Sequence, residues 1–166
     1  MVSGGLRLLI LDACVLIDFC EADASVLTVF SRNLGAIHVA STVLDEVEQL
    51  DDSNAASLGL NVIEPSLAQL VASAVKRGRL SAADHLCLVL ARENGWTCVS
   101  NDKALRTACK EEGIPVLWGL EVIALTVDAC LLSIEGAEKI AWRINESNPF
   151  ITKALVALFV AKLKKL

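Results

Sequence analysis

A buried-strand pattern that ends on an acidic residue constrains this chain more than any other feature. Residues 8–11 are a short run of leucine and isoleucine, which is typical of a parallel strand buried on both faces. Asp12 follows directly, and the apolar residues after it have helical spacing. In an open parallel sheet, ligands bind outside the carboxyl ends of the strands, so Asp12 would face such a crevice. Alternatively, Asp12 only caps the next helix.

Strands and helices alternate along most of the chain, with short connections. The pattern predicts further strands at residues 36–40, 60–63, 96–100 and 114–117. Helices are predicted over residues 14–33, 43–50, 66–75, 81–94 and 103–112. The polar residues 51–54 are predicted to form a loop. This alternation predicts a three-layer α/β/α sandwich around a mostly parallel five-stranded sheet.

Only helices are predicted from residue 119 onward. They cover residues 120–132, 135–143 and 150–163, and Pro149 stands at the start of the last one, where proline is tolerated. We therefore divide the chain into an α/β domain over residues 1–118 and a helical C-terminal extension over residues 119–166. The extension is expected to pack on the same domain.

The composition suits one domain with a large apolar core. The chain has 166 residues, 54% of them apolar, and a formal charge of −5. This charge does not indicate a general nucleic-acid binder, but it is compatible with a local acidic site that recruits a divalent cation. A mean hydropathy of +0.55 indicates apolar surface covered by another chain, either as the face of a homodimer or as a groove that binds a partner protein. Residues 23–30 and 150–163 are the candidate faces.

The cysteine pattern predicts a reducing, cytoplasmic environment. Six cysteines lie in apolar segments without a CxxC pair, and only two histidines accompany them, which favours buried thiols over zinc or disulfides. No secretory signal is evident at the start of the sequence. The most apolar window, residues 116–134, is interrupted by Glu121 and Asp128, so no membrane-spanning helix is expected.

Four acids occupy related places next to the predicted strands. Asp12 and Asp102 follow strands directly. Glu46 lies one turn into the helix after the second strand, and Asp84 lies in the first turn of its helix. If all four face one sheet edge, their carboxylates raise one another's pKa and need a cation to stay ionised at neutral pH. Oxygen ligands without Cys or His favour Mg²⁺ or Mn²⁺.

Each of these acids also has a purely structural interpretation. Asp84 has the capping-box spacing from Ser81, and Asp102 can be a helix cap. Asp45 competes with Glu46 as the acid that points inward. The coincidence of four such positions favours a site over four independent caps.

Four short segments carry a family resemblance. They are LDACVLI at residues 11–17, VLDEV at 43–47, SAAD at 81–84 with LAR at 90–92, and VSNDKAL at 99–105. In order and spacing, these segments resemble the PIN-domain ribonucleases, including the VapC-like toxins of toxin–antitoxin pairs. The resemblance covers roughly residues 6–118 and hardly reaches the helical tail. It implies a sheet order of 3-2-1-4-5 and metal-dependent hydrolysis of RNA phosphodiesters that leaves a 5′-phosphate.

The resemblance also implies residue roles. The catalytic acids would be Asp12, Glu46, Asp84 and Asp102. Of these, Asp12, Asp84 and Asp102 would hold Mg²⁺ or Mn²⁺, and a bound ion would activate water for attack on phosphorus. Ser100 matches the small hydroxyl residue found two positions before the last acid. The toxin members imply RNA as substrate and an antitoxin protein as partner.

Substrate contacts are predicted on the helix that Asp102 opens. Lys103, Arg106 and Lys110 fall at i, i+3 and i+7, so they form a basic stripe beside the site. The stripe either contacts RNA phosphates or is only a solvated helix face. Residues 76–79 are a second basic candidate.

The predicted chemistry needs no histidine. His85 is adjacent to Asp84, but neighbouring residues in a helix point in different directions, and His38 is expected to be a hydrogen-bonded core residue. Two other functions stay open. One is a catalytically silent PIN-like module that binds protein or RNA. The other is a receiver-like phosphotransfer domain, which would need a second acid after the first strand and a lysine where Trp118 and Gly119 stand.

Overall fold

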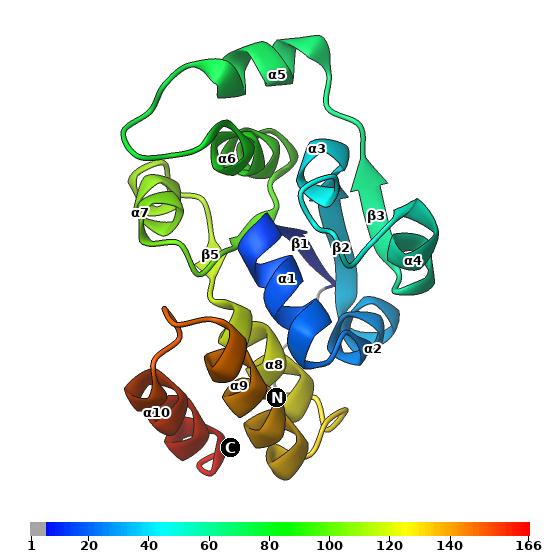
Figure 1. Cartoon of the computed structure of the whole chain (residues 1–166), viewed down its shortest axis with the longest axis vertical. Helices are drawn as coiled ribbons and strands as arrows, with labels where there is room; N and C mark the ends of the chain where they lie inside the picture. The colour runs from blue at the N-terminus through cyan, green and yellow to red at the C-terminus, as the bar shows by residue number, and fades with distance from the viewer. Residues whose placement is uncertain (1–5) are drawn as a thin grey trace.

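A five-stranded parallel sheet forms the centre of the molecule (Figure 1). The structure is a computed structural model, and it describes residues 6–166. The strand order is β3-β2-β1-β4-β5, and every neighbouring pair is parallel. The strands are β1 (Arg7–Leu11), β2 (Gly35–Ala40), β3 (Leu60–Ile63), β4 (Thr97–Val99) and β5 (Val116–Leu117). The α/β sandwich and the sheet order 3-2-1-4-5 are therefore confirmed.

The middle strand, β1, sets the register of the sheet. It pairs with β2 from Arg7↔Gly35 onward and with β4 from Leu9↔Thr97 onward. Its residues from Leu9 to Leu11 are fully buried, and successive strand residues point to opposite faces, so both faces of the sheet are covered. Because the strands are parallel, their carboxyl ends lie at the same edge of the sheet. Asp12 directly follows the carboxyl end of β1 at this edge.

Seven helices precede β5 in the described chain. They are α1 (Ala13–Ala22), α2 (Ser25–Asn33), α3 (Ser41–Leu44), α4 (Asp52–Ser57), α5 (Leu67–Ala74), α6 (Ala82–Asn94) and α7 (Lys103–Glu111). The single helix predicted over residues 14–33 is divided at Asp23, whose carboxylate accepts a hydrogen bond from the Ser25 N–H. The α2 segment is not a free apolar face, because it buries Val26, Leu27 and Phe30 in the core.

Two local predictions between β2 and β3 are wrong. The helix predicted over residues 43–50 ends at Leu44, and tight turns with i→i+3 bonds follow, which bury Val47 without continuing the helix. The loop predicted over residues 51–54 instead begins α4, because the Asp51 side chain caps the Asn54 N–H at 2.7 Å.

The C-terminal extension consists of α8 (Gly119–Asp128), α9 (Ile134–Ser147) and α10 (Lys153–Leu163). These helices lie at one end of the molecule and α5 lies at the other (Figure 1). The last helix begins at Lys153 rather than residue 150, because Thr152 caps it through the Leu155 N–H. The division of the chain at residue 118 stays a prediction. Residues 1–5, on which the prediction about a secretory signal partly rests, lie outside the described residues.

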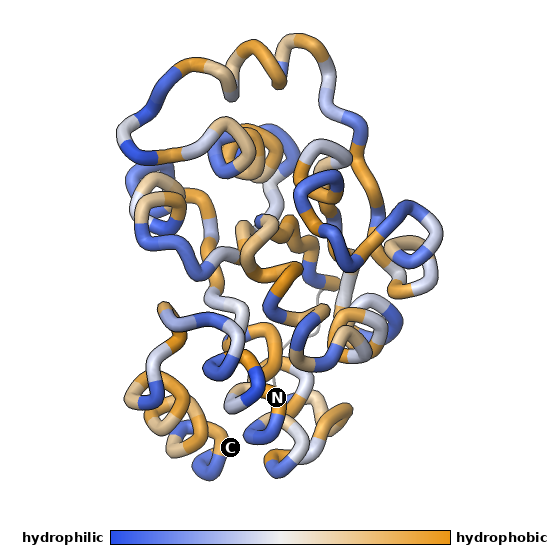
Figure 2. Tube along the Cα trace, in the orientation of Figure 1, coloured by the Kyte–Doolittle hydropathy of each residue, from blue (hydrophilic) through white to orange (hydrophobic). Residues whose placement is uncertain are grey.

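Apolar segments gather in the central strands and also on the outlying helices α5 and α10 (Figure 2). Between residues 6 and 166, no helix has both the length and the apolar character needed to cross a membrane.

Candidate active site

Asp12 lies at the end of β1 and is also the N-cap of α1. Its Oδ1 accepts a hydrogen bond from the Val15 N–H at 2.9 Å, and its Oδ2 accepts one from the Ser100 hydroxyl. The residue is only 1% exposed. Asp12 is therefore a helix cap, as the structural interpretation held, but a cap buried beneath the sheet edge.

The electrostatics of Asp12 show which acids are near it. Burial is the main reason why its pKa rises from the ordinary 3.8 to about 7. The hydrogen bonds from Ser100 and Val15 lower this pKa, whereas the charges of Asp84 and Asp102 raise it. The fold thus brings Asp12, Asp84 and Asp102 close together.

Ser100 connects two of these acids. Its hydroxyl donates to Asp12 and accepts from the backbone N–H of Asp102 at 3.0 Å. Asp102 is the N-cap of α7, with its Oδ1 accepting from the Leu105 N–H at 2.8 Å. The hydroxyl therefore holds the end of β1 against the start of α7.

Asp84 reaches the same place from a different direction. It lies in the first turn of α6, whose N-cap Ser81 accepts the Asp84 N–H at 3.1 Å, as the capping-box spacing predicts. Burial raises the pKa of Asp84, and the charge of Asp102 raises it further. Three helix N-termini, each a site of partial positive charge, thus face this group of carboxylates.

Glu46 has a different structural setting from the other three acids. It lies in an exposed turn after α3, not one turn into a helix as predicted. Burial raises the pKa of the Cys87 thiol, and the charges of Asp12, Asp84 and Glu46 add to this rise. The acid charges that raise the pKa of Asp12 most are those of Asp84 and Asp102, not that of Glu46. It therefore lies at the margin of the group.

The donor set suits a hard divalent cation, but the coordination shell is not preformed. Carboxylate oxygens are the ligands that Mg²⁺ and Mn²⁺ prefer, and an ionised carboxylate keeps lone pairs beyond those used in a cap. In residues 6–166, however, no three His, Cys, Asp or Glu side chains converge as a metal site. The chemistry of the residues fits the ion better than their present spacing does.

The basic residues divide into two groups. Lys103 lines a cavity of about 500 Å³ with Asp102 and Arg79, next to the acids. Arg106 points elsewhere: its guanidinium carbon lies 3.2 Å from the ring centroid of Trp118, and the side chain is half-buried. The predicted stripe of Lys103, Arg106 and Lys110 is therefore interrupted in its middle.

Comparison with known proteins shows the family and the fold of this chain. The model of the family DUF3368, described as a PIN domain, matches residues 8–165. The chain belongs to this PIN-domain family. The match includes the helical extension that the sequence motifs left uncovered.

A solved structure shares the fold of this PIN domain. It is a PilT N-terminus domain protein from the hyperthermophilic archaeon Sulfolobus solfataricus P2, with a TM-score of 0.52 and 15% sequence identity. The match covers 72% of the present chain and 93% of the archaeal one. Among curated proteins, no sequence matches the chain.

Neither histidine of the PIN domain serves the acids. His85 hydrogen-bonds through Nδ1 to the Val75 carbonyl at 2.9 Å, and because a carbonyl only accepts, Nδ1 carries the proton. His38 bonds the Leu9 carbonyl in the same way and stacks on Trp96 with ring centroids 3.8 Å apart.

Two residues near the site carry polar contacts that sequence reasoning assigned no role. Asp18 is a buried acid on α1, and Asn101 stands between Ser100 and Asp102. An acid inside the apolar run of residues 13–20 was the signal for Asp18. Cys14 is also adjacent: burial and the charges of Asp12 and Asp84 raise the pKa of its thiol to about 11, so it stays a neutral thiol.

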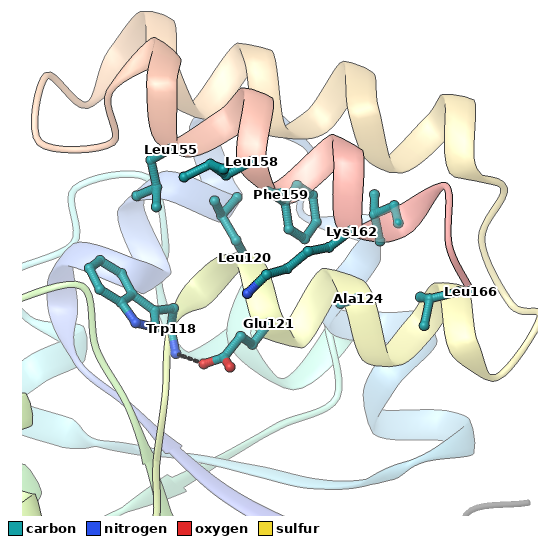
Figure 3. Close-up of a pocket in the computed structure, with 10 residues that line it drawn as sticks. Trp118, Leu120, Glu121, Ala124, Leu155, Leu158, Phe159, Lys162 and Leu166 are labelled. Atoms are coloured by element: carbon teal, nitrogen blue, oxygen red, sulfur yellow. Dashed lines mark hydrogen bonds between the residues drawn. The ribbon is translucent and has the colours of Figure 1, made fainter.

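A second cavity of the PIN domain lies between α8 and α10 (Figure 3). It has a volume of about 410 Å³ and is lined mainly by apolar side chains, including Leu120, Leu155 and Phe159. Glu121 accepts the Trp118 N–H at 2.8 Å on its wall. This cavity contains none of the predicted acids.

Proposed function

We propose that this PIN-domain protein is a Mg²⁺- or Mn²⁺-dependent endoribonuclease. PIN domains are generally nucleases. The observation that carries the proposal is the juxtaposition of Asp12, Asp84 and Asp102, with the pKa of Asp12 raised to about 7. Like charges crowded in a buried place are unfavourable unless a cation neutralises them, and such perturbed groups concentrate at functional sites.

Three of the four acids would bind the metal ion in this proposal. Asp12, Asp84 and Asp102 would hold the ion, and Glu46 would complete the acidic wall from the margin. A bound divalent ion supplies a water of lowered pKa and neutralises charge on the phosphoryl group. Ser100 keeps the Asp12 carboxylate in one orientation and links it to the backbone of Asp102. Neither histidine is needed as a base.

The phosphate contacts of the substrate would lie on one side of the acids. Lys103 and Arg79 are exposed and share a cavity with Asp102, so a strand whose phosphates lie there passes beside the carboxylates. Lys110 lies farther along α7 and would give only a weaker, long-range attraction. Arg106, stacked on Trp118, would contribute least of the predicted stripe.

A toxin role is the finer part of the same proposal. It is supported by the order of the four motifs, and it would place the protein in the cytoplasm with an antitoxin as its partner. Co-expression with the product of a small neighbouring reading frame should suppress the cleavage activity if this role is right. Cleavage that no such partner suppresses would favour an RNA-processing enzyme.

A catalytically silent binding module is the second candidate function. The specific observation in its favour is that no metal-holding group is preformed among residues 6–166. The near-complete burial of Asp12 points the same way, because an inaccessible carboxylate cannot bind an ion without local rearrangement.

Cleavage of a structured RNA pool separates the two candidates. We expect cutting with Mn²⁺ or Mg²⁺ that is lost in a chelator and in Asp12→Asn. The variant also serves as a purity control, because a contaminating ribonuclease would survive that substitution. Asp45→Asn is the matched control, since Asp45 is exposed next to Glu46 and should leave cutting intact. A folded protein that neither cuts RNA with any metal nor binds Mn²⁺ in calorimetry would leave the binding module in front.

A further inference from the structure

A buried polar cluster joins the C-terminal helices to the loop that carries Ser100 and Asp102. Its centre is Asp18 on α1, which is 5% exposed. Asn101 donates to its Oδ2 at 2.9 Å, and the Asn148 amide donates to Oδ2 at 2.9 Å and to Oδ1 at 3.1 Å. No basic side chain among residues 6–166 forms an ion pair with it. Two neutral amides thus hold a buried carboxylate, which is costly to bury.

Asn101 uses both ends of its amide outside its own loop. While Nδ2 donates to Asp18, Oδ1 accepts the N–H of Gly119 at the start of α8 at 3.0 Å. Because an amide is planar, these two bonds fix the plane of the Asn101 amide and tie this loop to both α1 and α8. The two residues that flank Asn101 in the chain are Ser100 and Asp102. Ser100 donates a hydrogen bond to Asp12 and accepts one from the Asp102 N–H.

Asn148 anchors the cluster to the C-terminal layer. It is the C-cap of α9, and its N–H donates to the Ile144 carbonyl at 2.8 Å. Its Oδ1 accepts the Phe150 N–H at 3.0 Å, which leaves Nδ2 directed at Asp18. Helix α9 packs directly on α1. The C-terminal layer and the acid-bearing loop therefore hold the same carboxylate.

We propose that the C-terminal helices complete the site: Asn148 and Asp18 are positioning residues that hold Asn101, and through it Ser100 and Asp102, in the arrangement that the acids require. The catalytic consequence rests on the proposed function. The placement of the loop does not, because it can be measured without metal or RNA.

Amide hydrogen exchange measured by NMR tests the placement. Asn148→Ala should make the Asp102 N–H, which bonds Ser100, exchange at least about tenfold faster. Arg143→Gln is the matched control, because Arg143 also joins α9 to α1, through the Ala22 carbonyl at 3.3 Å, without touching Asn101. Equal exchange of the Asp102 N–H in the two variants would overturn the proposal.

Metal binding and kinetics test the consequence. Asn148→Ala should weaken Mn²⁺ binding by about 10- to 100-fold and lower kcat while KM stays near the wild-type value. The double variant Asp18→Asn, Asn148→Asp should restore both, because an amide at position 18 can accept from Asn101 and donate to a carboxylate at position 148. A double variant no better than Asn148→Ala, although folded, would contradict the assigned contacts.

The two proposals fail in different ways. A wild-type protein that neither binds Mn²⁺ nor cuts RNA would remove the proposed function, and hydrogen exchange would still decide the positioning role. A wild-type protein that cuts RNA, with Asn148→Ala equally active and equally protected at Asp102, would remove only the positioning role.

Discussion

The buried environment of Asp12 favours the neutral, protonated form of its carboxyl group. Its pKa lies near 7 in the native protein because of burial, whereas an unfolded chain leaves it near 3.8. Between these values the native state binds more protons than the unfolded state. Stability of the metal-free protein should therefore fall as the pH rises through this window and reach its lower level above about pH 7.

Asp12→Asn should consequently stabilise the metal-free protein at pH 8. An amide can still accept from the Val15 N–H and donate to Ser100, without the charge. We expect a gain of about 1–3 kcal/mol in the free energy of unfolding, shrinking as the pH is lowered towards 4. Urea unfolding with a chelator at several pH values measures it. A difference independent of pH would contradict the burial of an ionisable Asp12.

The close approach of strand β1 to strand β2 depends on one glycine. Gly35 opens β2 opposite Arg7, and a Cβ at Gly35 would lie 1.8 Å from the Arg7 carbonyl oxygen. The two strands cannot keep this register with any side chain there. Because β1 carries Asp12 at its end, the register also sets the place of the site.

Gly35→Ala should therefore cost about 3 kcal/mol or more, or prevent folding. Gly113→Ala is the control: its φ is +69°, but nothing lies within 4 Å of the added Cβ, so only about 1 kcal/mol of backbone strain is expected. Thermal unfolding of both variants gives the comparison. If Gly35→Ala and Gly113→Ala destabilised the protein equally, β1 and β2 would be able to move apart without loss of stability, which would contradict this prediction.

A second pair of elements is joined by charge. Glu112, the C-cap of α7, accepts hydrogen bonds from Arg77 before α6 and from Arg92 on α6, the latter at 3.1 Å. Burial alone raises the pKa of Glu112, but the two arginines outweigh it and hold the pKa below the ordinary 4.5. A carboxyl with a lowered pKa stabilises the fold above that range, and this contribution is lost as the pH falls through the native pKa.

Glu112→Gln should destabilise the protein by about 0.5–1 kcal/mol at pH 7, since the ion pairs are partly exposed. The difference from wild type should be smaller at pH 3 than at pH 7. Glu111→Gln should have a smaller effect, because its carboxylate is 66% exposed and lies 3.7 Å from Arg77. Chemical unfolding at both pH values distinguishes the variants, and an undiminished Glu112 effect at pH 3 would rule out the charge.

Several of the most exposed large apolar side chains lie at two opposite ends of the molecule, on or next to α5 and α10 (Figure 1). Leu67 and Val71 on α5, and Val75 at its C-cap, are each more than 60% exposed and fall at i, i+4 and i+8, so they form one ridge. Antiparallel packing of two copies of α5 would also place the exposed Glu64 of one copy near the exposed Lys76 of the other.

We therefore expect the predicted homodimer to form through α5. Light scattering should show a dimer that Val71→Lys converts to a monomer, because a buried lysine has no partner on this ridge. Leu158→Lys, on the exposed face of α10, should leave the dimer intact. If only Leu158→Lys gives monomers, the interface lies on α10, and a monomeric wild type contradicts both faces.

Features that are local in the chain could be predicted from the order of its residues. A buried strand followed by an acid, and a capping spacing at the start of α6, are encoded within a few residues. The places of Asp12, Asp84 and Asp102 at strand ends and helix starts could therefore be predicted, and their role in a site stays a prediction. The strand order came from the resemblance of the motifs, and the described sheet has that order.

The partners that those residues contact depend on how the layers pack in three dimensions. Asp18 and Asn148 bond across 130 residues, and Arg106 stacks on Trp118 from a neighbouring element. Periodicity shows that a face is apolar but not what covers it, which is why residues 23–30 were taken for a free surface and 43–50 for a full helix. Side-chain pairing between distant elements depends on how the layers pack, and no local pattern encodes it.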